Sequence, residues 1–149
     1  MRLHVYPMAL LGLLLASLLS FDAGAQSAGQ TVSIKGGEKV RVAVSGKPEF
    51  FLRFAAVVSD ERCPARVKCA WANPPVVAIE ASAQGKPAQT FEISSGGPGG
   101  VRRGNYLGVP IEYADLTPAP QEPGEFAKVR PLATYTVVLK INGPEEKPR

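Results

Sequence analysis

The chain has 149 residues, a formal net charge of +4 at pH 7 and a single histidine, His4. We expect His4 to be removed with a signal peptide. The remaining chain would then contain no histidine. This excludes Ser-His-Asp and Cys-His nucleophile systems and most zinc or copper sites. Basic residues are mixed with acidic ones along the chain, whereas a nucleic-acid binder would show a denser basic stripe. The composition therefore predicts a protein with no catalytic residues, no metal and no cofactor, and no nucleic acid among its partners.

The N-terminus has the layout of a cleaved secretory signal. A short basic start is followed by an apolar run over residues 8–19 and then by small residues ending at Ala25. The run is shorter than the roughly 20 apolar residues that a membrane span needs. We expect residues 1–25 to be removed, leaving an exported protein, periplasmic or extracellular, with no membrane span.

Residues 26–149 read as one all-β domain with a flexible N-terminal lead-in and a flexible C-terminal tail. Alternating apolar and polar side chains, broken by turns rich in Gly and Pro, predict about seven strands. In chain order we expect strands at 31–35, 38–44, 49–58, 76–83, 88–93, 106–116 and 132–141. Pro110 should confine its strand to a sheet edge or a bulge. Residues 94–105 read as a long glycine-rich loop, and residues 117–125 as a proline-rich connection.

Strands of this number and spacing favour a β-sandwich, with a closed barrel as the alternative. The core residues are expected to be the inward-facing apolar side chains of these strands. They are Val40, Val42, Phe50, Leu52, Phe54, Val77, Ile79, Phe91, Ile93, Val137, Leu139 and Ile141.

The stretch from Ser59 to Ala72 holds both cysteines and the only tryptophan. In an oxidising compartment Cys63 and Cys69 should form a disulfide. The five residues between them are enough for the chain to curl back. So small a ring contributes about 2 kcal/mol in the loop-closure model and therefore fixes local shape.

The same stretch carries the pattern D-x-R-C-P-x-x-V-x-C-x-W-A over residues 60–72. It resembles a family of small uncharacterised exported bacterial proteins with that signature, in which a Y-x-V-x-L-x-V-like strand closes a β-rich domain. Residues 135–141 fit that closing strand. In place of the family's glycine after Trp-Ala, this chain has Asn73, which tolerates a left-handed backbone, followed by Pro74, which favours an extended one. The resemblance implies no activity.

Two interpretations of the cysteine loop remain open. As a structural staple, Trp71 would cap one end of the sandwich or cover the disulfide, and Arg62 would pair with Asp60 or stack on Trp71. As a recognition loop, the ring would present Arg66 and Lys68 in a pre-organised form to an envelope protein or a small ligand.

Three further hypotheses follow from the residues. A serine protease inhibitor would offer Arg66-Val67 or Lys68-Cys69 to a trypsin-like enzyme. Arg102 and Arg103, in the glycine-rich loop, would bind an anion or belong to a mobile loop. An enzyme using carboxylates would need Asp60 or Asp115 to meet another acid in a cleft. We expect a non-catalytic binding or structural protein of the bacterial envelope.

Overall fold

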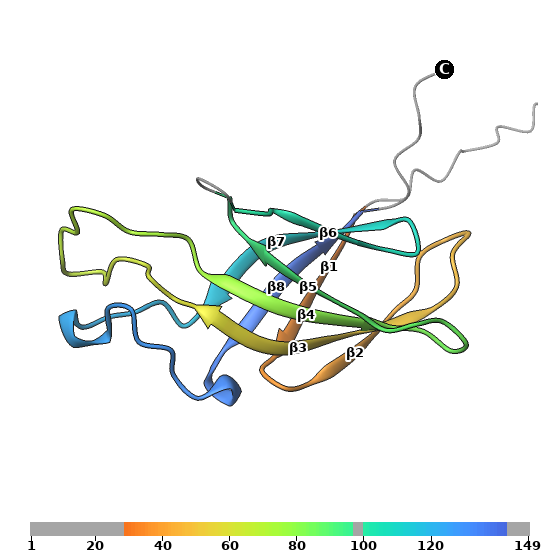
Figure 1. Cartoon of the computed structure of the whole chain (residues 1–149), viewed down its shortest axis with the longest axis horizontal. Coiled ribbons are helices and arrows are strands. Elements are labelled where there is room, and N and C mark those ends of the chain that lie inside the picture. The colour runs from red at the N-terminus through yellow and green to blue at the C-terminus, as the bar shows by residue number, and fades with distance from the viewer. Residues whose placement is uncertain (1–28, 97–99, 143–149) are drawn as a thin grey trace, which may run out of the picture.

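The computed structural model describes residues 29–96 and 100–142, and these form two antiparallel four-stranded sheets packed face to face (Figure 1). This confirms the predicted sandwich. The expected signal peptide and C-terminal tail lie outside the described residues. In one sheet the strands follow chain order: β2 (Lys39–Val42), β3 (Phe50–Ser59), β4 (Val76–Ser82) and β5 (Gln89–Ser94). The other sheet has the order β1 (Gln30–Lys35), β8 (Thr136–Ile141), β7 (Val109–Thr117) and β6 (Arg103–Tyr106).

The core fills the space between the two sheets, and most of the predicted core residues are in it. Val40 and Phe91 are only partly buried and pack against its margin, whereas the other predicted core residues are buried. The sequence analysis left out a second group of buried side chains, most of them on β6, β7 and their neighbours: Ile34, Val57, Tyr106, Val109, Ile111, Tyr113, Leu116 and Tyr135.

β-Bulges explain part of that omission. Beyond a bulge, the alternation of inward-facing and outward-facing residues along the strand is shifted by one position. On β3 the even-numbered positions from Phe50 to Phe54 face inward, but a register shift after Phe54 turns Val57 inward instead. On β7 a shift after Tyr113 likewise turns Leu116 inward. Strict alternation cannot place residues beyond such a point.

The hairpin of β6 and β7 corrects two predictions. Residues 103–106 form a strand instead of the end of a loop, and a turn at Leu107-Gly108 separates it from β7. Both turn residues have positive φ, 54° and 75°, as in a type I′ hairpin turn. The side-chain oxygen of Asn105 accepts a hydrogen bond from the Gly108 N–H at 3.1 Å. The sequence Asn-Tyr-Leu-Gly did not indicate this turn, because leucine seldom adopts positive φ.

The expectation that Pro110 marks an edge strand or a bulge is wrong, since β7 lies between β6 and β8 and its register shift comes three residues later. The carbonyl group of Pro110 points towards β8 and accepts a hydrogen bond from the Asn142 N–H at 3.2 Å. Asn142 follows the last residue of β8. This position is at the end of the β7–β8 ladder, where β7 contributes only a hydrogen-bond acceptor. The N–H group that proline lacks is therefore not needed there.

The last predicted strand, 132–141, is also too long at its start. Residues Leu132–Thr134 form a short 3-10 turn, η2, and β8 begins at Thr136. Another such turn, η1, spans Pro123–Glu125. Both belong to the segment 118–135 between β7 and β8, which we call the proline connection.

Gly104 allows the edge strands of the two sheets to approach each other closely. It is buried on β6, and a Cβ added there would lie 2.2 Å from Cδ2 of the Phe91 ring on β5. No side chain fits in that space unless the Phe91 ring moves.

We therefore expect Gly104→Ala to lower the free energy of unfolding by about 1–3 kcal/mol, the usual cost of overpacking. Urea unfolding followed by circular dichroism measures the change. The matched control is Gly124→Ala, because a Cβ at Gly124 would meet nothing within 4 Å and φ there is not positive. Equal effects of the two substitutions would contradict the packing argument.

Candidate functional site

Two long connections meet at one end of the sandwich (Figure 1). One is the segment 60–75 between β3 and β4, which we call the cysteine loop, and the other is the proline connection. The backbone N–H of Ala65 donates a hydrogen bond to the carbonyl of Pro120 at 3.3 Å and joins the two segments directly. These segments carry no regular strand, so their shape depends on side-chain contacts.

A buried ion pair is the first of these contacts. Nε of Arg62 donates to Oδ1 of Asp60 at 2.7 Å, and Nη2 donates to Oδ2 at 2.8 Å, so the pair is bidentate. The Asp60 side chain is only 1% exposed. The same guanidinium donates to the carbonyl of Leu116, near the end of β7, and to that of Pro118, the first residue of the proline connection. Burial opposes the charge of Arg62, but its bonds with Asp60 outweigh that effect and raise its pKa.

The pairing of Arg62 with Asp60 is therefore one prediction that the structure confirms. The alternative, in which Arg62 stacks on Trp71, is not realised. Within the described part of the chain, cation–ring contacts join Lys39 to Phe51 and Arg130 to Tyr135.

Tyr135 extends this pair into a network. Its hydroxyl donates to Oδ2 of Asp60 at 3.3 Å and accepts a hydrogen bond from the backbone N–H of Arg130 at 3.2 Å. Arg130 in turn donates through Nη2 to the carbonyl of Ala119 at 3.1 Å. Asp60 thus holds together the cysteine loop, the end of β7 and the approach to β8. From the sequence, Tyr135 is expected only as the first residue of the closing strand, and its bond to Asp60, 75 positions away, appears only in the folded chain.

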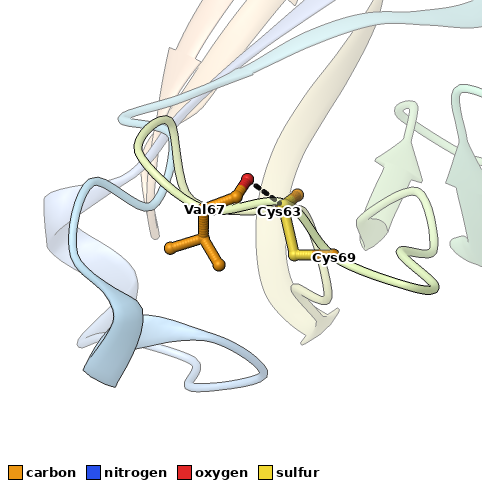
Figure 2. Close-up of a disulfide and its surroundings, with 3 residues drawn as sticks. All are labelled: Cys63, Val67 and Cys69. Carbon is orange, nitrogen blue, oxygen red and sulfur yellow. Dashed lines mark hydrogen bonds between the residues drawn. A yellow bond between two sulfur atoms is a disulfide. The ribbon is translucent and has the colours of Figure 1, made fainter.

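The predicted disulfide closes a tight ring within the cysteine loop. Cys63 and Cys69 are bonded, with their Cα atoms 5.8 Å apart. Inside the ring the Val67 N–H donates to the carbonyl of Pro64 at 3.1 Å, which forms a turn. The Val67 carbonyl oxygen lies 3.0 Å from Sγ of Cys63 (Figure 2). Because a disulfide sulfur carries no hydrogen, this is a close sulfur–oxygen contact.

Asn73 closes the base of the loop. Its backbone N–H donates to the carbonyl of Glu61 at 3.2 Å, and its side-chain amide donates to the Glu61 carboxylate. Among the described residues, Leu107 and Ala127 are the non-glycine residues with positive φ, so Asn73 does not use the left-handed conformation. The following Pro74 decides between the two expected geometries.

An apolar groove of about 310 Å³ lies between the two connections. The cysteine loop contributes Pro64, Val67, Cys69, Ala70 and Trp71, and the proline connection contributes Pro123 and Phe126. Trp71 is 75% exposed, so the alternative in which it caps one end of the sandwich is wrong, and it lines the groove together with Cys69 of the disulfide. The buried side chains of Tyr135 and Leu116 fill the core near the Asp60 network, whereas Trp71 lies on the groove wall.

Three of the large exposed apolar side chains belong to segments at the same end of the sandwich as the groove. Among the described residues the large exposed hydrophobic side chains are Phe51, Val58, Trp71, Val101 and Val129. Of these, Val58 lies near the end of β3, Trp71 in the cysteine loop and Val129 in the proline connection. Such clustering at one end of a small domain is typical of an interaction surface.

Exposed basic residues neighbour the groove lining along the chain, and we call them the border of the groove. Arg66 and Lys68 flank Val67 in sequence, Lys128 follows Phe126 by two positions, and all three are exposed. The ion pairs of the described residues do not include them. The nearby Glu125 accepts hydrogen bonds from the backbone N–H groups of Gln121 and Glu122, which lower its pKa, and it lies 3.5 Å from Arg130.

The other two predicted binding residues lie elsewhere. Arg103 is on edge strand β6 and pairs with Glu112 of β7, which lowers the pKa of that carboxyl. Together with exposed Arg102 and buried Tyr113, they line a separate cavity of about 350 Å³. Burial raises the pKa of Tyr113 to about 12. The structure therefore does not bring Arg102 and Arg103 to the groove.

The two carboxylates considered for catalysis have local partners. Asp60 faces Arg62, and Oδ1 of Asp115 accepts a hydrogen bond from the Leu116 N–H at 2.8 Å. Within residues 29–96 and 100–142, no three His, Cys, Asp or Glu side chains are grouped in a way that could hold a metal ion. In the same ranges no helix has the length and apolar character to cross a membrane.

No known protein family, curated protein or solved structure matches this chain. The resemblance carried by the D-x-R-C-P-x-x-V-x-C-x-W-A pattern therefore stays a prediction.

The Asp60 network leads to a prediction of stability. Arg62→Ala leaves the Asp60 carboxylate buried without its cation, so we expect the free energy of unfolding to fall by about 3 kcal/mol. The control is Arg41→Ala, because Arg41 and Glu49 form an exposed pair at 3.6 Å, and such pairs contribute about 0–1 kcal/mol. Urea unfolding of both variants gives the comparison. A loss for Arg62→Ala no greater than for Arg41→Ala would show that the network does not hold the loops.

Glu125 leads to a prediction of pH dependence. Its pKa in the folded protein is below the ordinary value of 4.5, so its stabilising effect is complete above the unfolded-state pKa. It is lost as the pH falls through the lower folded value. Carboxyl NMR titration should give a lower midpoint for Glu125 in the folded chain than in the same chain unfolded in urea. An equal or higher folded midpoint would contradict the assigned hydrogen bonds.

Proposed function

We propose that the protein is an exported, non-catalytic binding protein that holds its partner in the apolar groove between the cysteine loop and the proline connection. The observation that carries the proposal is Trp71, a large apolar side chain that is 75% exposed on the wall of a concave apolar surface. Water contact with such a side chain is unfavourable, and burial by a partner would remove it.

The construction of the groove supports a role in binding. Its walls come from loops on a rigid β scaffold, where binding residues commonly lie. The Cys63–Cys69 bond and the Asp60–Arg62 pair fix both walls before any partner arrives. A pre-organised surface loses less conformational entropy on association, and affinity rises accordingly.

The proposal includes export on two grounds. The first is the signal-like layout of residues 1–25. The second is the disulfide, since such bonds persist in oxidising compartments and are rare in the cytosol. The envelope is therefore the place in which to look for a partner.

Affinity capture from an envelope extract of the producing organism tests the proposal. We expect the disulfide-bonded protein to capture a specific partner and Trp71→Ala to lose it. Val101→Ala is the matched control, because Val101 is also exposed, at 57%, but does not line the groove. Equal capture by both variants would move the binding surface away from the groove.

A variant with Cys63→Ser and Cys69→Ser separates the ring from the groove residues. We expect it to fold with a free energy of unfolding about 2 kcal/mol lower, from loss of the loop constraint. It should also capture less partner, since one wall of the groove is no longer fixed.

The protease-inhibitor hypothesis is the second candidate, favoured by the exposure of Arg66 and Lys68 on the disulfide-closed ring. Titration of the oxidised protein against a trypsin-like enzyme tests it. Slow-off, stoichiometric inhibition would support it. Simple cleavage after Arg66 or Lys68 would leave the groove as the functional surface.

A further inference from the structure

We infer that the groove binds an extended, proline-containing segment of an acidic polypeptide. This inference rests on the proposed function, because it names the chemical class of the partner for the same groove. It combines two independent observations: the chemistry of the groove lining and the charge of its border.

The lining favours recognition by apolar rings. Trp71 and Phe126 supply aromatic surface, Pro64 and Pro123 supply aliphatic rings, and all the remaining lining side chains are apolar as well. The indole N–H of Trp71 is therefore the one polar side-chain group of the lining that could position a hydrogen-bonding ligand. Polyproline II segments suit such a surface, because their backbone is solvated and they dock on aromatic-lined grooves through their rings.

The volume of the groove also favours a polypeptide segment over a bulky small molecule. Its volume of about 310 Å³ is at the lower end of the range for small-molecule pockets. It accommodates a few side chains of a chain that passes across it and continues on both sides.

The charge at the border selects an acidic partner. Arg66, Lys68 and Lys128 are exposed and take part in no ion pair among the described residues. Of the nearby acids, Glu125 is paired with Arg130, whereas Glu61 keeps its negative charge because its partner, the Asn73 amide, is neutral. Exposed Glu122 is a second unpaired acid, so the three cations exceed the unpaired acids by one. Carboxylates on either side of an apolar anchor would complement this excess of cations.

A membrane surface fits the same residues less well. Exposed tryptophan and basic residues also occur on proteins that lie at anionic lipid surfaces. Here, however, the apolar side chains line a concave space, and a flat bilayer surface would leave that space unfilled. A polypeptide segment enters it.

Fluorescence anisotropy with three labelled synthetic peptides tests the inference. The first consists of Glu-Pro-Pro repeats, the second of Lys-Pro-Pro repeats and the third of Glu-Gly-Gly repeats of equal length. We expect the oxidised protein to bind the first at least about tenfold more tightly than either of the others. The second peptide tests the charge, and the third tests the need for proline rings.

Three variants assign that binding to the groove. Trp71→Ala should weaken it about 30-fold, as expected for an aromatic anchor. The double variant Arg66→Glu with Lys68→Glu changes only exposed side chains and should prefer the Lys-Pro-Pro peptide. Val101→Ala should bind like the unmodified protein. Circular dichroism and urea unfolding show that each variant is folded.

Three outcomes would overturn the inference: no binding of the Glu-Pro-Pro peptide, equal affinity for all three peptides, or binding of anionic phospholipid vesicles in place of the peptides. If envelope capture still depends on Trp71 in any of these cases, the groove is the binding surface and only the partner class is wrong. If Trp71→Ala changes neither capture nor peptide binding, the proposed function fails as well.

Discussion

The ion pair between Asp60 and Arg62 is the interaction on which this end of the molecule depends. A carboxylate that is 1% exposed is costly to bury unless its charge is matched and its oxygens are hydrogen-bonded. Arg62 matches the charge, and the Tyr135 hydroxyl adds a further hydrogen bond. Arg62 also donates to one carbonyl near the end of β7 and to one at the start of the proline connection. One buried charge therefore fixes two loops that have no sheet hydrogen bonds of their own.

The two ends of the D-x-R-C-P-x-x-V-x-C-x-W-A stretch have different structural roles. Its first residues, Asp60 and Arg62, face inward and attach the loop to the sandwich. The disulfide then gives the loop its curvature, and Trp71 is left on the outside. The staple and recognition interpretations of the sequence are therefore not exclusive. The inner half of the loop is a staple, and the outer half forms a surface.

Much of the fold could be predicted because local patterns determine it. Phe50, Leu52 and Phe54 alternate with outward-facing residues, and the structure buries all three. The β6–β7 hairpin could not be found in this way, because its turn uses Leu107 with positive φ and its strand contains Gly104. For the site, sequence proximity was enough to pair Cys63 with Cys69, and it made the Asp60–Arg62 pair one of two alternatives for Arg62. The opposite wall of the groove was not predictable, since Phe126 meets the cysteine loop only through long-range folding.

The pairing of the first strand with the last has a consequence for attachment. Gln30 of β1 lies directly opposite Ile141 of β8, so both ends of the folded domain leave it side by side. That exit is at the end of the sandwich opposite the cysteine loop (Figure 1). Strands rise about 3.3 Å per residue, so the 6 residues of β8 separate the exit from the proline connection by about 20 Å. A tether, a fused domain or a solid support attached at either end would therefore hold the molecule with its groove facing away and unobstructed.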